Sequence, residues 1–163
     1  QVRQKHPGAM MLASEMCVGF SPYDPADWAT AANPYYFEIM SDINTGASAW
    51  LDWNMLLSWQ GGPSYCKNYV KSPAILNDAG DDFILTPIYD ALKKFARLFP
   101  VGSQIARCEY DSKDIAVVAR KTKNSYEVVI ANTSDQKQEV EIKLGKQNKR
   151  LSLNKLEIRK VTF

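Results

Sequence analysis

Histidine is almost absent from this sequence, and cysteine is scarce. The one histidine is His6, and the three cysteines, Cys17, Cys66 and Cys108, are widely spaced and form no CxxC pair. Triad chemistry and a histidine-based metal centre both need more histidine than this, so we expect neither. The cysteine spacing fits no zinc pattern, and an odd count favours free buried thiols, although one pair could form a disulfide in an exported protein.

Long apolar runs and a basic surface stripe are also missing. No apolar run could cross a bilayer, so we expect no membrane span. Residues 101–163 hold 13 Lys and Arg against 8 Asp and Glu, yet 15 of the 18 aromatic residues precede residue 101. Nucleic-acid binding needs basic and aromatic residues interleaved, so we expect no nucleic-acid partner. The slightly acidic aromatic half, with 7 basic and 10 acidic residues, better suits a neutral ring-shaped ligand.

What the first hundred residues do contain is an alternation of strand and helix patterns. An apolar segment over residues 9–15 predicts a buried strand, and a long loop follows over residues 17–33. Asn33-Pro34 predicts a helix start, with Asn33 as the N-cap, and apolar residues at helical spacing continue to Ala47. A second strand over residues 48–57, a loop over 58–82 and a helix over 88–99 come next. This order is the α/β pattern of two consecutive βα units.

After Pro100 the pattern changes to short alternating strands separated by turn residues. The expected strands cover residues 104–110, 115–120, 127–131, 139–144 and 156–163. They predict an antiparallel β-sandwich or half-sandwich. We place the domain boundary near Pro100, giving domains at residues 1–100 and 101–163, which we expect to pack together because no flexible linker separates them.

Chemistry-bearing residues follow both predicted strands of the first domain. Glu15 ends the first strand, the position from which a barrel enzyme presents a catalytic group, although a carboxylate that starts a turn is the simpler interpretation of that segment alone. Trp50 and Trp53 on the second strand are expected to turn flat apolar faces to the same side, where a sugar ring could stack. Core packing is an equally good interpretation for Trp50. The Gly61-Gly62-Pro63 turn would bring the Asn68 amide close to a ligand.

Five segments in register resemble glycoside hydrolase family 30, and most closely its glucosylceramidase branch. They are residues 12–19 (LASEMCVG), 50–54 (WLDWN), 61–63 (GGP), 68–73 (NYVKSP) and 95–103 (FARLFPVGS). The resemblance implies the last two βα units of a (β/α)8 TIM barrel, α/β in class, followed by an all-β sandwich domain.

The same resemblance implies roles for individual residues. Glu15 stands at the position of the catalytic nucleophile of a retaining β-glycosidase, Trp53 at that of an indole lining the sugar pocket, and Asn68 at that of an amide near the sugar. Trp28 would shape the pocket rim. The implied substrate is a β-glycoside, either an oligosaccharide or a glycolipid. The family resemblance implies no cofactor and an extracellular or periplasmic location.

The sequence departs from the family in lacking the Asn-Glu pair that carries the acid/base carboxylate. Asp24 and Asp52 are local alternatives, but Asp52 is expected to point away from Trp53. We therefore expect this chain to need an N-terminal barrel portion as its partner and to be inactive alone. Two alternatives stay open, a non-catalytic carbohydrate-binding module and a structural fragment without a ligand.

Overall fold

Two short parallel strands and the helix between them form the start of the fold. The computed structural model describes residues 2–19 and 24–163. Strand β1 (Leu12–Ala13) pairs with β3 (Ala49–Trp50) in parallel, Leu12 opposite Ala49 and Ala13 opposite Trp50. Helix α3 (Ala32–Thr45) connects them, which is the predicted βα order. The remaining short elements of this region are α1 (Val2–Lys5), β2 (Val18–Gly19) and α2 (Pro25–Trp28).

The expected second strand over residues 48–57 is wrong in its length. Strand β3 stops at Trp50, and the chain becomes extended again only in β4 (Leu56–Leu57). The expected loop over residues 58–82 is also interrupted, because it contains β5 and β6. The strands that follow β4 are β5 (Val70–Lys71), β6 (Ala74–Leu76) and β7 (Phe83–Leu85). Strand β6 lies between β4, in parallel, and β7, antiparallel.

The two main helices end as their sequences predict, but α3 does not begin as predicted. Its N-cap is Ala31, which makes no side-chain cap. The preceding turn is already closed by the Asn33 N–H donating to the Thr30 carbonyl, so Asn33 lies inside the helix. Gly46 ends α3 in the left-handed region at φ 112°, where glycine avoids the strain of a Cβ. Helix α4 (Pro87–Leu98) begins with proline in its first turn.

The last third of the chain is an antiparallel sheet and a separate hairpin. The sheet has the order β13-β10-β9-β8, and the hairpin pairs β11 with β12. The bounds are β8 (Gln104–Ala106), β9 (Ile115–Lys121), β10 (Tyr126–Asn132), β11 (Gln138–Leu144), β12 (Gln147–Leu153) and β13 (Ile158–Thr162). The sequence analysis missed β12, whose first four residues are polar and exposed.

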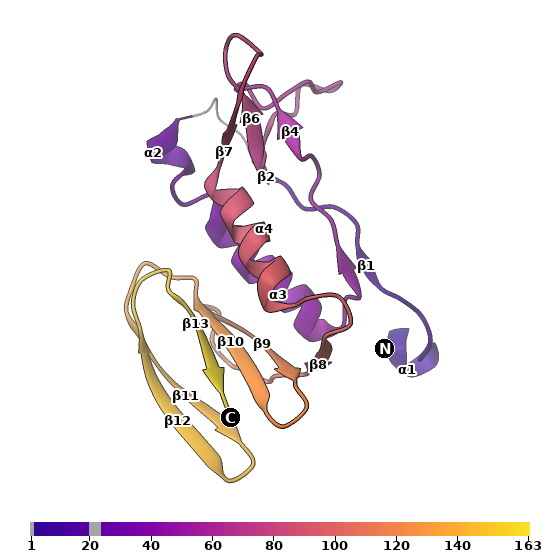
Figure 1. Cartoon of the computed structure of the whole chain (residues 1–163), viewed down its shortest axis with the longest axis vertical. Coiled ribbons are helices and arrows are strands. Elements are labelled where there is room, and N and C mark those ends of the chain that lie inside the picture. Colours follow the sequence, from indigo (N-terminus) through magenta and orange to yellow (C-terminus); the bar gives the residue numbers. More distant parts are fainter. Residues whose placement is uncertain (1, 20–23) are drawn as a thin grey trace.

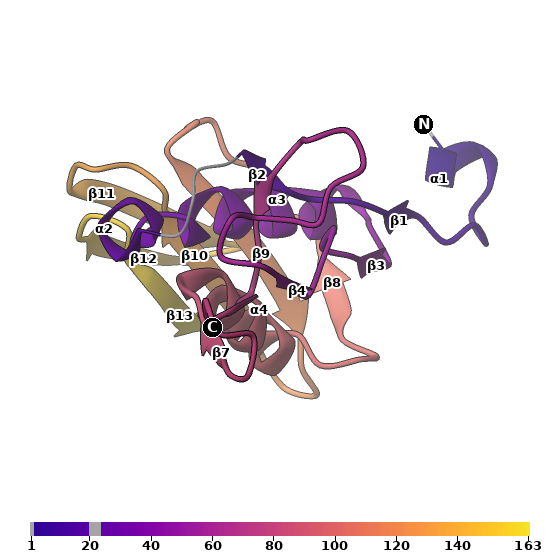
Figure 2. The same ribbon diagram turned by 90° about the horizontal axis from the view of Figure 1, so that it is seen from above.

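The central strands β9 and β10 are buried on both faces. Alternate residues point to opposite faces of a strand, so each face can meet a different layer. Ala116, Val118 and Val129 pack with α3 and α4 in one cluster. Val117 and Ile130 pack with the hairpin in the other. Figures 1 and 2 show the hairpin on the far side of the sheet from α3. The expected packing of the first hundred residues against the rest of the chain is therefore present.

The Asn44 side chain joins α3 to the segment that follows β8 by two hydrogen bonds. Its side-chain amide donates to the Cys108 carbonyl at 2.8 Å, and its side-chain oxygen accepts from the Cys108 N–H at 2.7 Å. Asn44 is buried. Such a two-point bond satisfies both backbone polar groups of Cys108, so it fixes the orientation of this segment as well as its distance from α3.

Candidate active site

Glu15 lies just beyond the end of β1, in the connection to β2, and its side chain is exposed. Backbone bonds continue past the regular strands on both sides of it. The Leu51 N–H donates to the Ala13 carbonyl at 2.9 Å, and the Trp53 N–H donates to the Met16 carbonyl at 2.8 Å. Glu15 and Trp53 therefore follow the carboxyl ends of two neighbouring parallel strands, the edge at which α/β barrels place their chemistry.

The two tryptophans of this region have different environments. Trp53 is 54% exposed, whereas Trp50 packs against the core and meets the Tyr35 ring edge-on at a centroid distance of 5.8 Å. The expectation that both indoles face one side is wrong. They are three residues apart, and β3 ends between them, so only Trp53 offers a flat apolar face to a ligand.

Asn68 lies just before β5, which pairs with β2. Gly19 lies opposite Val70 in this antiparallel pair, and Asn68 is two residues before Val70. The Asn68 N–H donates to the Ser64 hydroxyl at 2.9 Å, which leaves its exposed side chain free to reach outward. The structure thus joins the segments of Glu15 and Trp53, whereas the antiparallel register leads Asn68 away from Glu15, so its expected place near the sugar stays a prediction.

The Gly61-Gly62-Pro63 turn fixes the loop that carries Asn68. Gly61 has φ +82°, and a Cβ there would come within 2.7 Å of the Val70 carbonyl oxygen. The Val70 N–H donates to the Gly61 carbonyl at 3.2 Å. A side chain at Gly61 would therefore both strain the backbone and displace β5, which explains why glycine occupies this position.

Trp28 is placed differently from what its expected role at a pocket rim requires. It is fully buried in the core, with the Lys71 amine 5.4 Å from its ring centroid. Its ring has no exposed face that could contact a sugar. The expected effect of Trp28 on the shape of the pocket rim stays a prediction. Asp24, one of the alternative acids, caps α2 by accepting from the Ala26 N–H at 2.9 Å. Residues 20–23 of the expected loop over 17–33 lie outside the described residues.

Asp52 is half-buried beside Trp53 and is held by two hydrogen bonds. Its Oδ1 accepts from the Tyr35 hydroxyl at 3.0 Å and from the Trp53 N–H at 2.9 Å. Its Oδ2 is buried and has no partner among residues 2–19 and 24–163. Burial raises the pKa of Asp52 to about 6, against the two hydrogen bonds, which lower it. The carboxylate points to the core while Trp53 is exposed, so the two side chains diverge as expected.

Tyr35 and Cys17 share the electrostatic environment of Asp52. Burial raises the pKa of the Tyr35 hydroxyl, and the charge of Asp52 raises it further. The pKa of the Cys17 thiol is raised by burial first, then by the charges of Glu15 and Asp52. Two carboxylates therefore act on one thiol between β1 and β2. Periodicity alone could not reveal this cluster, because its members come from three separate segments.

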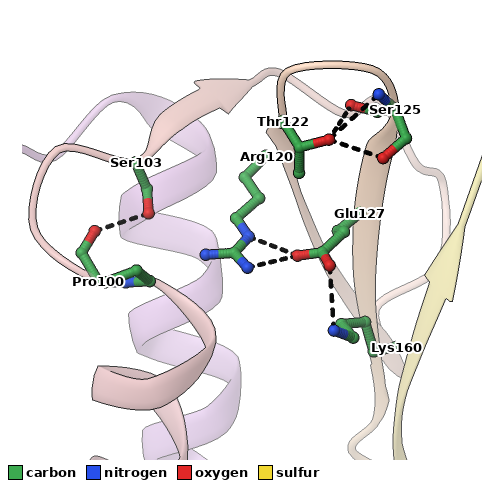
Figure 3. Close-up of polar contacts among 7 residues, drawn as sticks. All are labelled: Pro100, Ser103, Arg120, Thr122, Ser125, Glu127 and Lys160. Carbon is green, nitrogen blue, oxygen red and sulfur yellow. Dashed lines mark hydrogen bonds and ion pairs between the residues drawn. The ribbon is translucent and has the colours of Figure 1, made fainter.

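A hollow of about 600 Å³ lies elsewhere, beside the turn between β9 and β10. Two of the polar side chains that line it are already paired (Figure 3): Arg120 with Glu127 at 2.6 Å, which Lys160 also contacts at 3.1 Å, and Thr122 with Ser125 at 2.7 Å. The Ser103 hydroxyl donates to the Pro100 carbonyl. Saturated pairs of this kind stabilise a sheet end, so we do not assign a ligand to this hollow.

Metal and membrane sites were also sought in the structure. In the described part of the chain, no group of three or more His, Cys, Asp or Glu side chains is arranged to hold a metal ion. Within the same residues, every helix is too short or too polar to cross a bilayer.

Comparison with known proteins gives one family match and several relatives. The glycosyl hydrolase family 30 TIM-barrel domain matches residues 1–99. The putative glucosylceramidase 3 of Caenorhabditis elegans is 35% identical over 104 residues, 62% of this chain and 20% of that protein. The lysosomal acid glucosylceramidase of Mus musculus is 32% identical over 136 residues, 80% of this chain and 26% of that protein. The chain thus spans a fifth to a quarter of these relatives.

Solved structures resemble this fold over nearly its whole length. The match to SrfJ from Salmonella typhimurium covers 99% of this chain and 36% of the SrfJ chain, with a TM-score of 0.80 and 20% sequence identity. The match to an endo-β-1,6-glucanase covers 96% of this chain and 36% of the glucanase chain, with a TM-score of 0.69 and 16% sequence identity. At these identities the likeness concerns the fold alone, including the antiparallel sheet after Pro100.

Proposed function

Because this chain belongs to glycosyl hydrolase family 30, we propose that it supplies the nucleophile half of a retaining β-glycosidase site. The observation that carries the proposal is the placement of Glu15 and Trp53 at the ends of neighbouring parallel strands, joined by the Trp53 N–H to Met16 carbonyl bond of 2.8 Å. A carboxylate beside an exposed indole is the combination that a retaining glycosidase needs to bind and attack a sugar ring.

In this mechanism the Glu15 carboxylate attacks the anomeric carbon of the sugar. The bond to the leaving oxygen breaks as a glycosyl–enzyme ester forms, and water then hydrolyses that ester. Glu15 is exposed, so a substrate can reach it. The Trp53 indole packs on the apolar face of the ring, and the Asn68 amide donates to or accepts from a sugar hydroxyl.

The proton for the leaving oxygen must come from a second carboxylic acid about 5 Å from the nucleophile. Asp24 serves as a helix cap, and the Asp52 Oδ1 is held by Tyr35. We therefore assign the acid to an N-terminal barrel portion outside residues 1–163. The names of the relatives, glucosylceramidase and β-1,6-glucanase, make a β-glucoside the first substrate to test.

The experiment is covalent trapping in the full-length protein that carries this chain. A 2-fluoro-β-glucoside with an activated leaving group should label Glu15, located by peptide mass spectrometry, with stoichiometry near one. Glu15→Gln should abolish labelling, whereas the matched control Glu109→Gln, at an exposed position in the segment after β8, should label normally. Label on another carboxylate would contradict the assignment of the nucleophile.

A further inference from the structure

Asp52 has no part in the mechanism above, yet two hydrogen bonds hold it in the site. Its Oδ1 accepts two hydrogen bonds, one from the Tyr35 hydroxyl at 3.0 Å and one from the Trp53 N–H at 2.9 Å. The same Trp53 N–H also donates to the Met16 carbonyl at 2.8 Å. Asp52 therefore contacts the group that sets Trp53 in register with the segment of Glu15.

Tyr35, which donates one of these hydrogen bonds to Asp52, is held rigidly. Tyr35 belongs to α3, is fully buried, and lies edge-on to Trp50 with ring centroids 5.8 Å apart. A hydroxyl held in a packed core cannot follow the carboxylate if it moves. The Trp53 N–H already pairs with the Met16 carbonyl beyond the end of β3, and the Asp52 side chain gives this N–H a second acceptor.

The second oxygen of the carboxyl group shows that this role is more than structural. Oδ2 is buried, and no partner for it exists among residues 2–19 and 24–163. An asparagine would keep the acceptor at Oδ1 and would avoid burying an ionisable group. A carboxylate at this position is therefore the less stable choice, which points to a use for its charge.

The charge of Asp52 reaches the nucleophile's surroundings. Two titratable groups interact with it: the Tyr35 hydroxyl from α3, which donates to Oδ1, and the Cys17 thiol from the connection between β1 and β2. The Cys17 thiol lies within the field of both Glu15 and Asp52, since each of them raises its pKa. Glu15 and Asp52 therefore act on the same thiol, Glu15 from an exposed position and Asp52 from a half-buried one.

We propose that Asp52 is a positioning residue that holds Trp53 in register with Glu15 and places a fixed negative charge beneath the sugar site. This charge favours the positively charged, oxocarbenium-like transition state of glycoside cleavage over the neutral substrate. The inference rests on the proposed function, since it presupposes that a sugar reacts at Glu15. It also predicts that the site prefers cationic ring ligands to neutral ones of the same shape.

Binding of two matched ligands to the full-length protein tests the charge. A glucose-configured piperidine iminosugar, protonated on its ring nitrogen, is compared with neutral glucose by calorimetry. Asp52→Asn should weaken iminosugar binding about tenfold relative to its effect on glucose, because only the cation interacts with the lost charge. The matched control Asp111→Asn, at an exposed carboxylate after β8, should change neither.

The pH dependence of labelling at Glu15 supplies a second readout. An activated 2-fluoroglycoside needs no acid catalyst, so its rate reports Glu15 and Asp52 without the absent acid. The native protein should label faster as Asp52 ionises around its raised pKa of about 6. In Asp52→Asn, this rise of the labelling rate with pH should disappear, and the slower rate should hold at every pH.

The outcomes separate this inference from the proposed function. Failure to label Glu15 in the native protein would contradict the proposed function itself. Suppose that the native protein labels normally, but Asp52→Asn weakens binding of the iminosugar and of glucose equally, or weakens neither. That result would overturn the proposed role of the Asp52 charge and would leave the assignment of the nucleophile intact. If Asp52→Asn does not fold, Tyr35→Phe removes one donor to the carboxylate and should move the rise of the labelling rate to higher pH. If the labelling rate of Tyr35→Phe rises over the same pH range as that of the native protein, the inference is likewise overturned.

Discussion

At the scale of single residues, Asp52 links stability to pH in a direction opposite to that of most surface carboxylates. Its pKa in the folded chain is raised from 3.8 to about 6, because burial disfavours the charged form. A raised pKa means that the folded state binds the proton more tightly than the unfolded state. The stabilisation by the proton is complete below pH 3.8 and is lost as the pH rises towards about 6.

We expect Asp52→Asn to remove this pH dependence in residues 1–163. The native chain should lose about 3 kcal/mol of unfolding free energy relative to the variant as Asp52 ionises, since its pKa is raised by about two units and each unit corresponds to about 1.4 kcal/mol. Urea unfolding at several pH values on either side of the raised pKa measures the difference. Parallel stability curves for the two proteins would show that Asp52 does not titrate in this window.

Trp53 and Trp28 form a matched pair that separates ligand binding from packing. Trp53→Ala should leave stability within about 0.5 kcal/mol, because more than half of the side chain is exposed, but should abolish stacking with a sugar. Trp28→Ala should cost about 3–5 kcal/mol, because the ring is fully buried and leaves a cavity. Thermal unfolding of both variants checks the contrast, and a large loss for Trp53→Ala would mean that the indole is structural.

At the scale of elements, the joint between α3 and the antiparallel sheet depends on Asn44. Asn44→Ala would leave the Cys108 N–H and carbonyl unpaired at a half-buried position, at an expected cost of about 1–3 kcal/mol. Denaturant unfolding measures this, with Asn124→Ala at an exposed turn as the control. Equal stability of Asn44→Ala and the native chain would show that apolar packing alone holds the joint.

The elements also show how far local pattern extends. Helices α3 and α4 were predictable because apolar spacing, Gly46 and Pro87 act within a few residues of each other. Strand β12 was not, because its polar outer face carries no alternation strong enough to see. Only Leu151 and Leu153 reach the interior, and β11 supplies the rest of the hairpin by pairing. The early end of β3 was equally hidden, since no local signal separates Trp50 from Leu51.

At the scale of the whole molecule, several apolar side chains near β1, β3 and β7 are left uncovered by residues 2–19 and 24–163. Met10 is 81% exposed, Leu12 53%, Leu51 50% and Phe83 56%. Exposed apolar side chains beside short open strand edges are typical of an interface. This agrees with the proposed N-terminal barrel portion as the partner of residues 1–100.

We expect residues 1–163 by themselves to associate in a concentration-dependent manner and to hydrolyse no aryl β-glucoside. Association follows from the uncovered apolar side chains, and inactivity from the absence of a second catalytic acid. Analytical ultracentrifugation and a chromogenic assay measure the two properties. Replacing Met10 and Leu12 by serine should reduce association, and turnover that disappears in Glu15→Gln would contradict the half-site proposal.

The sequence by itself determined the family, the order of strands and helices, and the candidates Glu15, Trp53 and Asn68, because family signatures and helix ends are local patterns. Tertiary structure decided which of these share a surface. It separated Trp50 from Trp53, moved Trp28 into the core, and joined Asp52 to Tyr35 across 17 positions of sequence. Burial and partner choice depend on the three-dimensional packing of distant segments, and no pattern within one segment specifies them.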